Sequence, residues 1–376
     1  MRTGPRRTRV DIRQQRKLDH IRQALSLEDG PIPNGFKDVR LIHEALPNLD
    51  SRDIDISVSF LGKTLTMPLL INAITGGTPQ VTDINRRLAR IAAKAGIGIA
   101  VGSQAAALRD PAMRESYQVV REENPDGIVI ANVNPNTPVD QAIKAIEMIQ
   151  ADALQVHLNV AQEMAMAEGD RDFRHWPENL AELIRHCPVP VIAKEVGNGV
   201  SFETAERLME LGVRYIDVGG AGGTNFIAIE MRRRGLELQE FEAWGISSAV
   251  TLAEVAWSAS DCLRSDEKLT IIASGGIRNG WEAAKSFALG AKVAAVAGSV
   301  LKHLLSSSDG EQSVVKYIEE FRQELIVSFT LTNSSNLDTF AQQPCLILGE
   351  VKEWLEQRGI PIAFWSQRNR KNPVSR

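Results

Sequence analysis

Four polar residues that could act together lie in the stretch HLNVAQE: His157, Asn159, Gln162 and Glu163. His157 and Asn159 alternate, so both side chains face the same side of an extended strand. Gln162 and Glu163 then fall in the loop just beyond. A carboxylate there suits Mg²⁺, which typically binds one or two protein carboxylates and substrate phosphate oxygens. A helix-capping or salt-bridged Glu163 is the alternative interpretation of the same residue.

Lys194 lies inside the apolar run VIAKEVG. A buried lysine is costly unless its ammonium meets an anion. One candidate partner is the pyrimidine end of a flavin, where reduction places negative charge. Pairing with Glu195 or another carboxylate is a second interpretation, and a lysine that forms a Schiff base is a third. The residues alone leave all three open.

Glycine-rich loops follow two other apolar runs, in IIASGGIR at 271–278 and at Ala297-Gly298. Backbone amides after the seventh and eighth strands of an α/β barrel form its usual phosphate site, together with a helix N-terminus. Arg278 could add a charge-assisted contact to the phosphate. The alternative is that these glycines only serve tight turns.

These residues end strands of a repeated strand–helix pattern that begins near residue 68. Continuous apolar runs are typical of strands buried on both faces. Eight such units predict an α/β fold of the closed (β/α)₈ TIM-barrel type. A doubly wound sheet would instead have GxGxxG after its first strand, where this chain has Thr75-Gly76-Gly77. The predicted strands are Pro68–Ile74, Gly98–Gly102, Ile128–Val133, Ala153–Asn159, Pro190–Val196, Tyr215–Gly219, Leu269–Ser274 and Lys292–Gly298.

Four regions follow from this pattern. Residues 1–15 form a basic arm that we expect to be disordered, and 16–67 form an N-terminal extension expected to cover the barrel mouth. The barrel occupies 68–305. Residues 306–376 form a C-terminal helical extension with a polar tail, and 313–331 carry its longest helical pattern.

The composition bears on which kinds of partner the protein binds. The net charge of −4 argues against a global basic field for nucleic acid. No apolar run reaches the roughly 18 residues of a membrane span. Cys187, Cys262 and Cys345 show no metal-ligand or CxxC spacing, and a disulfide framework is improbable in so large a chain. A reducing cytoplasm is therefore the simplest compartment. We therefore expect a cytoplasmic enzyme with a small-molecule substrate.

The motifs together resemble type 2 isopentenyl diphosphate isomerases, from about residue 16 to beyond 350. The stretches that carry the resemblance include RKLDH at 16–20, INAITGG at 71–77, VGSQ at 101–104, ALQVHLNVAQE at 153–163, VIAKEVGNG at 191–199, IDVGGAGGTNFIAIE at 216–230 and IIASGGIR at 271–278.

The resemblance implies interconversion of isopentenyl and dimethylallyl diphosphate by proton transfer, in isoprenoid precursor biosynthesis. It implies reduced FMN, Mg²⁺ on Glu163, NADPH as reductant and a homo-oligomer. The catalytic residues would be His157, Gln162, Glu163 and Lys194. The residues expected to hold FMN are Ala73, Ile74, Thr75, Ser103, Asn132, Lys194, Thr224, Gly275, Gly276, Ile277, Arg278, Ala297 and Gly298. Those expected at the substrate are Arg16, Lys17, His20, Ser103, Gln104, Ala105, His157, Asn159 and Gln162.

Three positions depart from the family pattern: Ile74 stands where Met is expected, Asn134 replaces a glycine, and Ala105 stands where one branch has arginine. Two other functions remain to be weighed. An FMN-dependent hydroxy-acid oxidase would need a histidine base in the region that reads GGAGGTNF, and none is present. A non-catalytic flavoprotein would need neither HLNVAQE nor RKLDH. The sequence therefore favours the isomerase.

Overall fold

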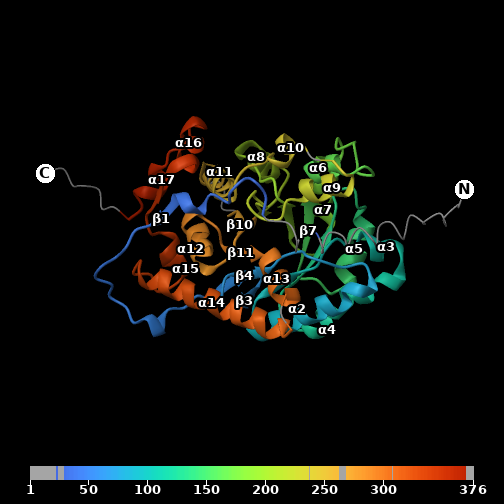
Figure 1. Ribbon diagram of the computed structural model, residues 1–376, viewed down its shortest axis with the longest axis horizontal. Coiled ribbons are helices and arrows are strands. Elements are labelled where there is room, and N and C mark those ends of the chain that lie inside the picture. Colours follow the sequence, from blue (N-terminus) through green and yellow to red (C-terminus); the bar gives the residue numbers. More distant parts are fainter. Residues whose placement is uncertain (1–22, 24–28, 237, 262–267, 307, 370–376) are drawn as a thin grey trace, which may run out of the picture.

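Eight short parallel strands close into a barrel, as the repeated pattern predicts. The computed structural model describes residues 23, 29–236, 238–261, 268–306 and 308–369. Figure 1 shows the helices arranged around the strands. The barrel strands are β4 Leu69–Ile71, β5 Gly98–Ala100, β6 Val129–Val133, β7 Ala153–Leu158, β8 Val191–Glu195, β9 Tyr215–Asp217, β10 Thr270–Ala273 and β11 Val293–Val296.

Burial explains why these segments are continuously apolar. Every residue of β4, β5, β6 and β11 is buried, because one face packs inside the barrel and the other against the helices. Several strands stop short of their predicted ends, and β4 ends at Ile71 rather than Ile74. The polar residues that follow leave the strand pairing and form loops at the carboxyl end of the barrel.

The helices between the strands present one apolar face to the barrel. In α2, the buried side chains include Leu88, Ile91 and Ala92, which recur at helical spacing. Gly96 ends this helix with a φ of 64°, a conformation that favours glycine. The barrel helices are α2 Thr82–Ala95, α3 Ala105–Arg109, α4 Glu115–Glu123, α5 Val139–Met148, α6 Val160–Ala165, α7 Trp176–His186, α8 Phe202–Glu210, α9 Phe226–Arg233, α10 Gln239–Glu242, α11 Ser248–Asp261, α12 Gly280–Leu289 and α13 Gly298–Ser306.

Side-chain caps fix where several helices begin after the loops at the barrel mouth. Ser201 accepts a hydrogen bond from the Thr204 amide at the start of α8. Asn225 and Asn279 cap α9 and α12 in the same way. Because each cap lies just after a strand-end loop, it also holds one end of that loop.

The N-terminal extension contacts both ends of the barrel. The hairpin of β2 (Val58–Phe60) and β3 (Lys63–Leu65) lies at the amino ends of the strands. There the Lys63 ammonium contacts Asp152 at 2.6 Å and the Gly127 carbonyl at 3.1 Å. At the carboxyl ends of the strands, Asn34 donates to the Gly276 carbonyl at 2.8 Å. That residues 16–67 cover the barrel mouth stays a prediction.

The C-terminal extension packs beside the barrel. Strand β12 (Cys345–Ile347) pairs antiparallel with β1 (Val39–Leu41), so the two extensions share a small sheet that the sequence did not predict. The fully buried carboxylate of Glu254 on α11 accepts hydrogen bonds from Trp354 and Arg358. The remaining elements are η1 Phe36–Asp38, η2 Ser51–Asp53, η3 Pro79–Val81, η4 Pro111–Met113, α14 Gly310–Thr330, α15 Leu337–Ala341, α16 Gly349–Gln357 and α17 Ala363–Ser366.

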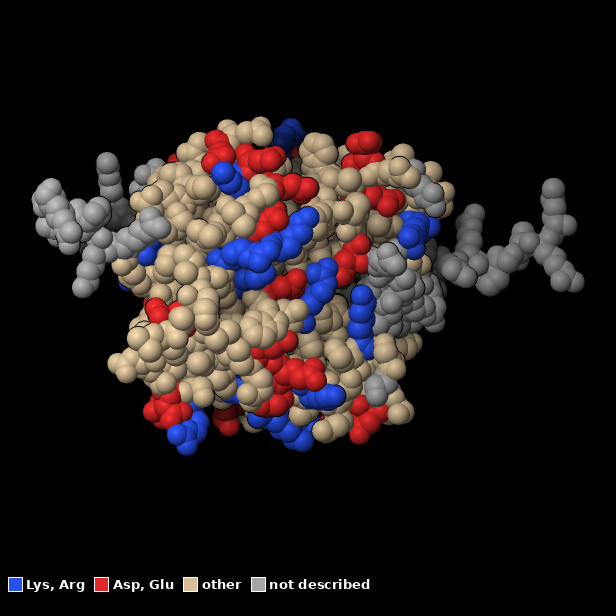
Figure 2. Space-filling model, turned by 60° about the vertical axis from the view of Figure 1, so that its left-hand side comes forward, with Lys and Arg blue, Asp and Glu red and all other residues tan. Residues whose placement is uncertain are grey.

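The surface carries a mixture of charges. On the face in Figure 2, basic side chains alternate with acidic ones rather than forming a uniform basic field. Among the described helices, none is both long and apolar enough to cross a membrane.

A layer of hydrogen-bonded polar side chains fills the carboxyl end of the barrel interior. The Asn72 amide donates to Asp217 at 2.7 Å, and the Gln155 amide donates to Asn72 at 3.0 Å. Asn132 in turn donates to Gln155 at 3.2 Å. His157 Nδ1 lies 2.8 Å from the Asn132 carbonyl oxygen, which can only accept, so Nδ1 carries the proton. The layer thus joins several strands through satisfied polar groups.

His157 is neutral in this layer at physiological pH. Burial, followed by the positive charge of Lys194, lowers the pKa of His157 to about 4. The unfolded chain binds a proton at this histidine below about pH 6.5, whereas the folded protein does so only near pH 4. The stabilisation from the neutral ring is therefore complete above pH 6.5 and is lost as the pH falls toward 4.

We expect a His157→Asn variant to show a flatter pH dependence of the free energy of unfolding than the wild type. Between pH 6.5 and pH 4, the wild type should lose at most about 3 kcal/mol more of its free energy of unfolding than the variant does. Urea denaturation at several pH values measures it. At pH 8, the difference in free energy of unfolding between the wild type and the variant gives the pH-independent effect of the substitution. Parallel curves down to pH 4 would contradict a neutral His157.

Candidate active site

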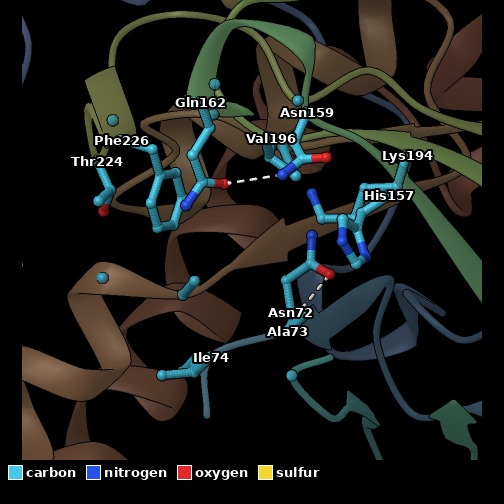
Figure 3. Close-up of a pocket in the computed structure, with 18 of the residues that line it drawn as sticks. Asn72, Ala73, Ile74, His157, Asn159, Gln162, Lys194, Val196, Thr224 and Phe226 are labelled. Atoms are coloured by element: carbon cyan, nitrogen blue, oxygen red, sulfur yellow. Dashed lines mark hydrogen bonds between the residues drawn. The ribbon is translucent and has the colours of Figure 1, made fainter. Parts of the chain in front are cut away.

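The loops at the carboxyl ends of the barrel strands surround a cavity of about 680 Å³. This is the size of a pocket for a cofactor or a small molecule. Figure 3 shows side chains from several strands pointing into it. The predicted site residues that line it are Ala73, Ile74, Thr75, Ser103, Ala105, Asn132, His157, Asn159, Gln162, Glu163, Lys194, Thr224, Gly275, Gly276, Ile277, Arg278, Ala297 and Gly298.

Gln104 is the predicted site residue that lies elsewhere. Its side chain is fully buried, donates to the Ala145 carbonyl at 2.9 Å and accepts from the Asn132 amide at 3.0 Å. These bonds hold the loop after β5 against α5 and β6 and turn the Gln104 side chain away from the cavity. That Gln104 contacts substrate stays a prediction. Arg16, Lys17 and His20 lie outside the described residues.

Lys194 enters the cavity from β8 with its ammonium held in place. Its Nζ lies 3.2 Å from Asp217 Oδ2 and donates to the Glu195 carbonyl at 2.9 Å. The lysine side chain is 9% exposed and that of Asp217 is 0% exposed. Lys194 therefore has a carboxylate partner and still faces the cavity.

Glu195 is not that partner. Its carboxylate accepts from the backbone amides of Gly197, Asn198 and Gly199, at distances of 2.7, 2.6 and 3.1 Å. Burial raises the pKa of Glu195 to about 7, and the backbone amide donors oppose that shift. The residue thus fixes the loop after β8, where Val196 and Gly197 line the cavity.

The polar residues after β7 form a compact group. Gln162 and Glu163 lie in the first turn of α6 rather than in the loop that the sequence predicts. The Asn159 amide donates to Gln162 at 3.3 Å and to Glu163 at 3.0 Å. Glu163 also accepts from the Asp170 amide at 2.8 Å. Asn159 and Asp170 therefore orient one carboxylate at the cavity wall.

A metal at this group would need ligands beyond the protein. The part of the chain that the structure describes holds no cluster of three or more His, Cys, Asp or Glu side chains suited to a metal ion. Mg²⁺ commonly binds through a single carboxylate, water and substrate phosphate oxygens. Glu163 fits that mode of binding.

The glycines after β10 are required by the backbone. Gly275 and Gly276 have φ angles of 103° and 69°. A Cβ on either would lie 2.0 Å from a backbone oxygen, of Gly220 and Gly222 respectively. At Gly298, the first residue of α13, a Cβ would contact only the Thr224 hydroxyl, at 3.4 Å. The helix N-terminus is therefore open toward the cavity, as a phosphate site needs.

Arg278 lines the same end of the cavity but is already paired. Its guanidinium forms an ion pair with Asp29 at 2.6 Å and donates to the carbonyls of Gly222 and Gly276 at 2.7 Å. Asn34 donates to Gly276 at 2.8 Å. Arg278 therefore ties the N-terminal segment to the glycine loop, in addition to any contact with a phosphate.

Apolar side chains line two opposite sides of the cavity. In Figure 3, Phe226 and Val196 lie on the same side as Gln162, whereas Ile74 lies across the cavity with Ala73. Lys194 and the glycine loops after β10 and β11 line the same cavity. The cavity thus has the features of an FMN site.

Some residues that line the cavity or contact its lining were missed by the sequence analysis. Asp217 is the main one: it is a fully buried acid in the apolar run YIDVGG. The argument that singled out Lys194, a charge inside an apolar strand, applies equally to Asp217 and would have found it. Phe226 and Val196 carry no comparable signal, because apolar residues are common throughout the barrel.

Comparisons with known proteins agree with this geometry. Residues 108–346 match the family model described as FMN-dependent dehydrogenase. The chain is 45% identical over 371 residues to an isopentenyl-diphosphate delta-isomerase from Symbiobacterium thermophilum, covering 96% of this chain and 100% of that protein. It is 46% identical over 347 residues to one from Moorella thermoacetica, covering 92% and 97%.

Solved structures support the fold alone. Mandelate oxidase with (S)-2-phenylpropionate superposes with a TM-score of 0.63 at 16% identity, covering 90% of this chain and 98% of that one. Identity this low carries no argument about activity. The sequence relatives are far closer and span nearly the whole length. The chain belongs to the isopentenyl-diphosphate delta-isomerases and to the FMN-dependent dehydrogenase family.

Proposed function

We propose that this protein is a type 2 isopentenyl-diphosphate delta-isomerase, which interconverts isopentenyl and dimethylallyl diphosphate with reduced FMN and Mg²⁺. One observation carries the proposal: a buried, charged lysine, an oriented carboxylate and an open glycine-rich phosphate site all face a single cavity. We further propose that NADPH supplies the electrons that reduce the flavin.

The chain's own residues would hold FMN from several sides. Gly275, Gly276 and Gly298 would take the phosphate through backbone amides. Lys194 would face the pyrimidine end, and Ile74 would pack against the ring. When bound and reduced, the flavin supplies a proton donor and acceptor that can act on an unactivated alkene.

The diphosphate would bind beside α6. Mg²⁺ on Glu163 would neutralise part of its charge, and Asn159 would keep the Glu163 carboxylate in place. Gln162, next to Glu163, can donate or accept a hydrogen bond at the substrate. For Arg16, Lys17 and His20 we retain the proposal that they contact the diphosphate.

His157 would act as a neutral group. Its low pKa means that the ring carries no charge at physiological pH, so it cannot serve as a resident cationic acid. Its Nδ1 proton is committed to Asn132, which leaves Nε2 as the unprotonated nitrogen. The apolar walls around Phe226 would exclude water from the reacting carbons.

A hydroxy-acid oxidase is the alternative on the same barrel. Such an enzyme would need a histidine base after the sixth strand, and the loop from Gly219 to Thr224 contains none. Asn225 follows it and is used to cap α9. The residues in this loop therefore favour the isomerase.

We also propose a cytoplasmic homo-oligomer. Leu46 is 85% exposed and Trp244 is 69% exposed, and contact with a second copy of the chain would cover these apolar side chains. Light scattering on the purified protein measures the oligomeric state.

Product formation should not be coupled to stoichiometric oxidation of NADPH. Isomerisation moves a proton and a double bond without net electron transfer, whereas a dehydrogenase consumes one acceptor per turnover. With isopentenyl diphosphate, Mg²⁺, FMN and NADPH under anaerobic conditions, we expect many product molecules per NADPH consumed. Dithionite should replace NADPH.

Following product by mass spectrometry and NADPH by absorbance tests this directly. One NADPH lost per product molecule would favour an oxidoreductase. Absence of product with fully reduced enzyme would remove the isomerase proposal.

Glu163→Gln should weaken the dependence on Mg²⁺ while leaving FMN bound. Gln keeps the size of the side chain and one acceptor oxygen but loses the charge that binds the metal. We expect the Mg²⁺ concentration for half-maximal activity to rise at least tenfold, since losing a charge-assisted contact costs about 1.5–3 kcal/mol. A Mg²⁺ titration of the initial rate measures it.

Asp172→Asn is the matched control. Asp172 lies in the loop after α6 and pairs with Arg174, but it does not line the cavity. This variant should keep the wild-type Mg²⁺ titration. If the wild type, Glu163→Gln and Asp172→Asn all reach half-maximal activity at the same Mg²⁺ concentration, Glu163 does not bind the metal.

A further inference from the structure

Asp217 has polar contacts with four side chains in the barrel interior, yet it is not among the described residues that line the cavity. It accepts from Asn72 at 2.7 Å, from the Lys194 ammonium at 3.2 Å and from Gln155 at 3.5 Å. The Ser274 hydroxyl donates to its second oxygen. These four donors hold the fully buried carboxylate in a fixed position.

Strand pairing places the charged residues in a row. His157 on β7 is the register partner of Lys194 on β8, and Lys194 is the partner of Asp217 on β9. The lysine thus lies between a neutral ring and an anion. Two of its ammonium hydrogens have acceptors, Asp217 and the Glu195 carbonyl, and Lys194 also lines the cavity.

We propose that Asp217 is a positioning residue that sets how much positive charge Lys194 presents to bound FMN. The inference rests on the proposed function, since it requires FMN in this cavity. The Asp217 carboxylate fixes the direction of the Lys194 ammonium. It also offsets most of the charge that an anionic reduced flavin meets. Asp217 therefore limits the preference of the site for reduced over oxidised FMN.

The expected effects have opposite signs for the two members of the pair. Reduction of oxidised FMN takes two electrons and one proton, and it leaves a negative charge on the flavin. Removing Asp217 leaves the site less negative, so the midpoint potential should rise. Removing Lys194 leaves the site more negative, so the potential should fall. A merely structural role of Asp217 predicts no rise.

The test measures the midpoint potential of FMN in the holoenzyme by anaerobic dithionite titration against reference dyes. In Asp217→Asn, the affinity for reduced relative to oxidised FMN should increase at least tenfold, or about 30 mV for this two-electron couple. In Lys194→Met, the affinity for reduced relative to oxidised FMN should decrease. The double variant should lie between the two.

Asp152→Asn is the matched control. Asp152 is also ion-paired, to Lys63 and Arg121, but it lies at the opposite end of the barrel. This variant makes the same chemical change and should leave the potential unchanged.

An unchanged or lower potential in Asp217→Asn would overturn the inference. If that variant does not fold, the double variant decides: a potential above that of Lys194→Met supports the role, and an equal one overturns it. A wild-type protein that binds no FMN would overturn the proposed function together with this inference. Bound FMN with no rise in potential overturns this inference alone.

Discussion

Burying an ammonium inside a barrel is possible only where the protein supplies an anion and further acceptors. Lys194 meets that requirement through Asp217 and the Glu195 carbonyl. Isolated buried charges cost several kcal/mol each, and their mutual attraction offsets this only with good geometry. The pair therefore constrains its surroundings: Asn72 and Ser274 must be placed to satisfy Asp217.

The need to satisfy Lys194 and Asp217 also constrains the other strand ends at the mouth of the barrel. The polar layer joins residues from β6, β7, β8 and β9 with those that follow β4 and β10. A shift of one strand by a single residue would turn its polar side chain to the helical face and leave partners unsatisfied. The layer thus fixes the strand register, and the loops that hold Glu163 and Gly275 begin from it.

The barrel and most of the cavity could be predicted from the sequence because both depend on periodicity. Residues just past each apolar run must meet at one end of a parallel barrel, which located Lys194, Asn132 and the glycine loops. The inward direction of the Gln104 side chain could not be predicted, because the direction of a side chain beyond a strand end follows from local packing, here against Ala145. The helical position of Gln162 and Glu163 was missed because α6 is only 6 residues long.

The two ends of the cavity are suited to anions in different ways. At Gly275, Gly276 and Gly298, open backbone and a helix N-terminus offer amide hydrogens, so a phosphate can bind without a metal. Around α6, the cavity is lined by the carboxylates of Glu163 and Asp170, which repel a bare diphosphate. A cation bound between these carboxylates and the diphosphate turns the repulsion into attraction. The charges that each end presents are the observation that supports the proposal of FMN at one end and of a magnesium-bound diphosphate at the other.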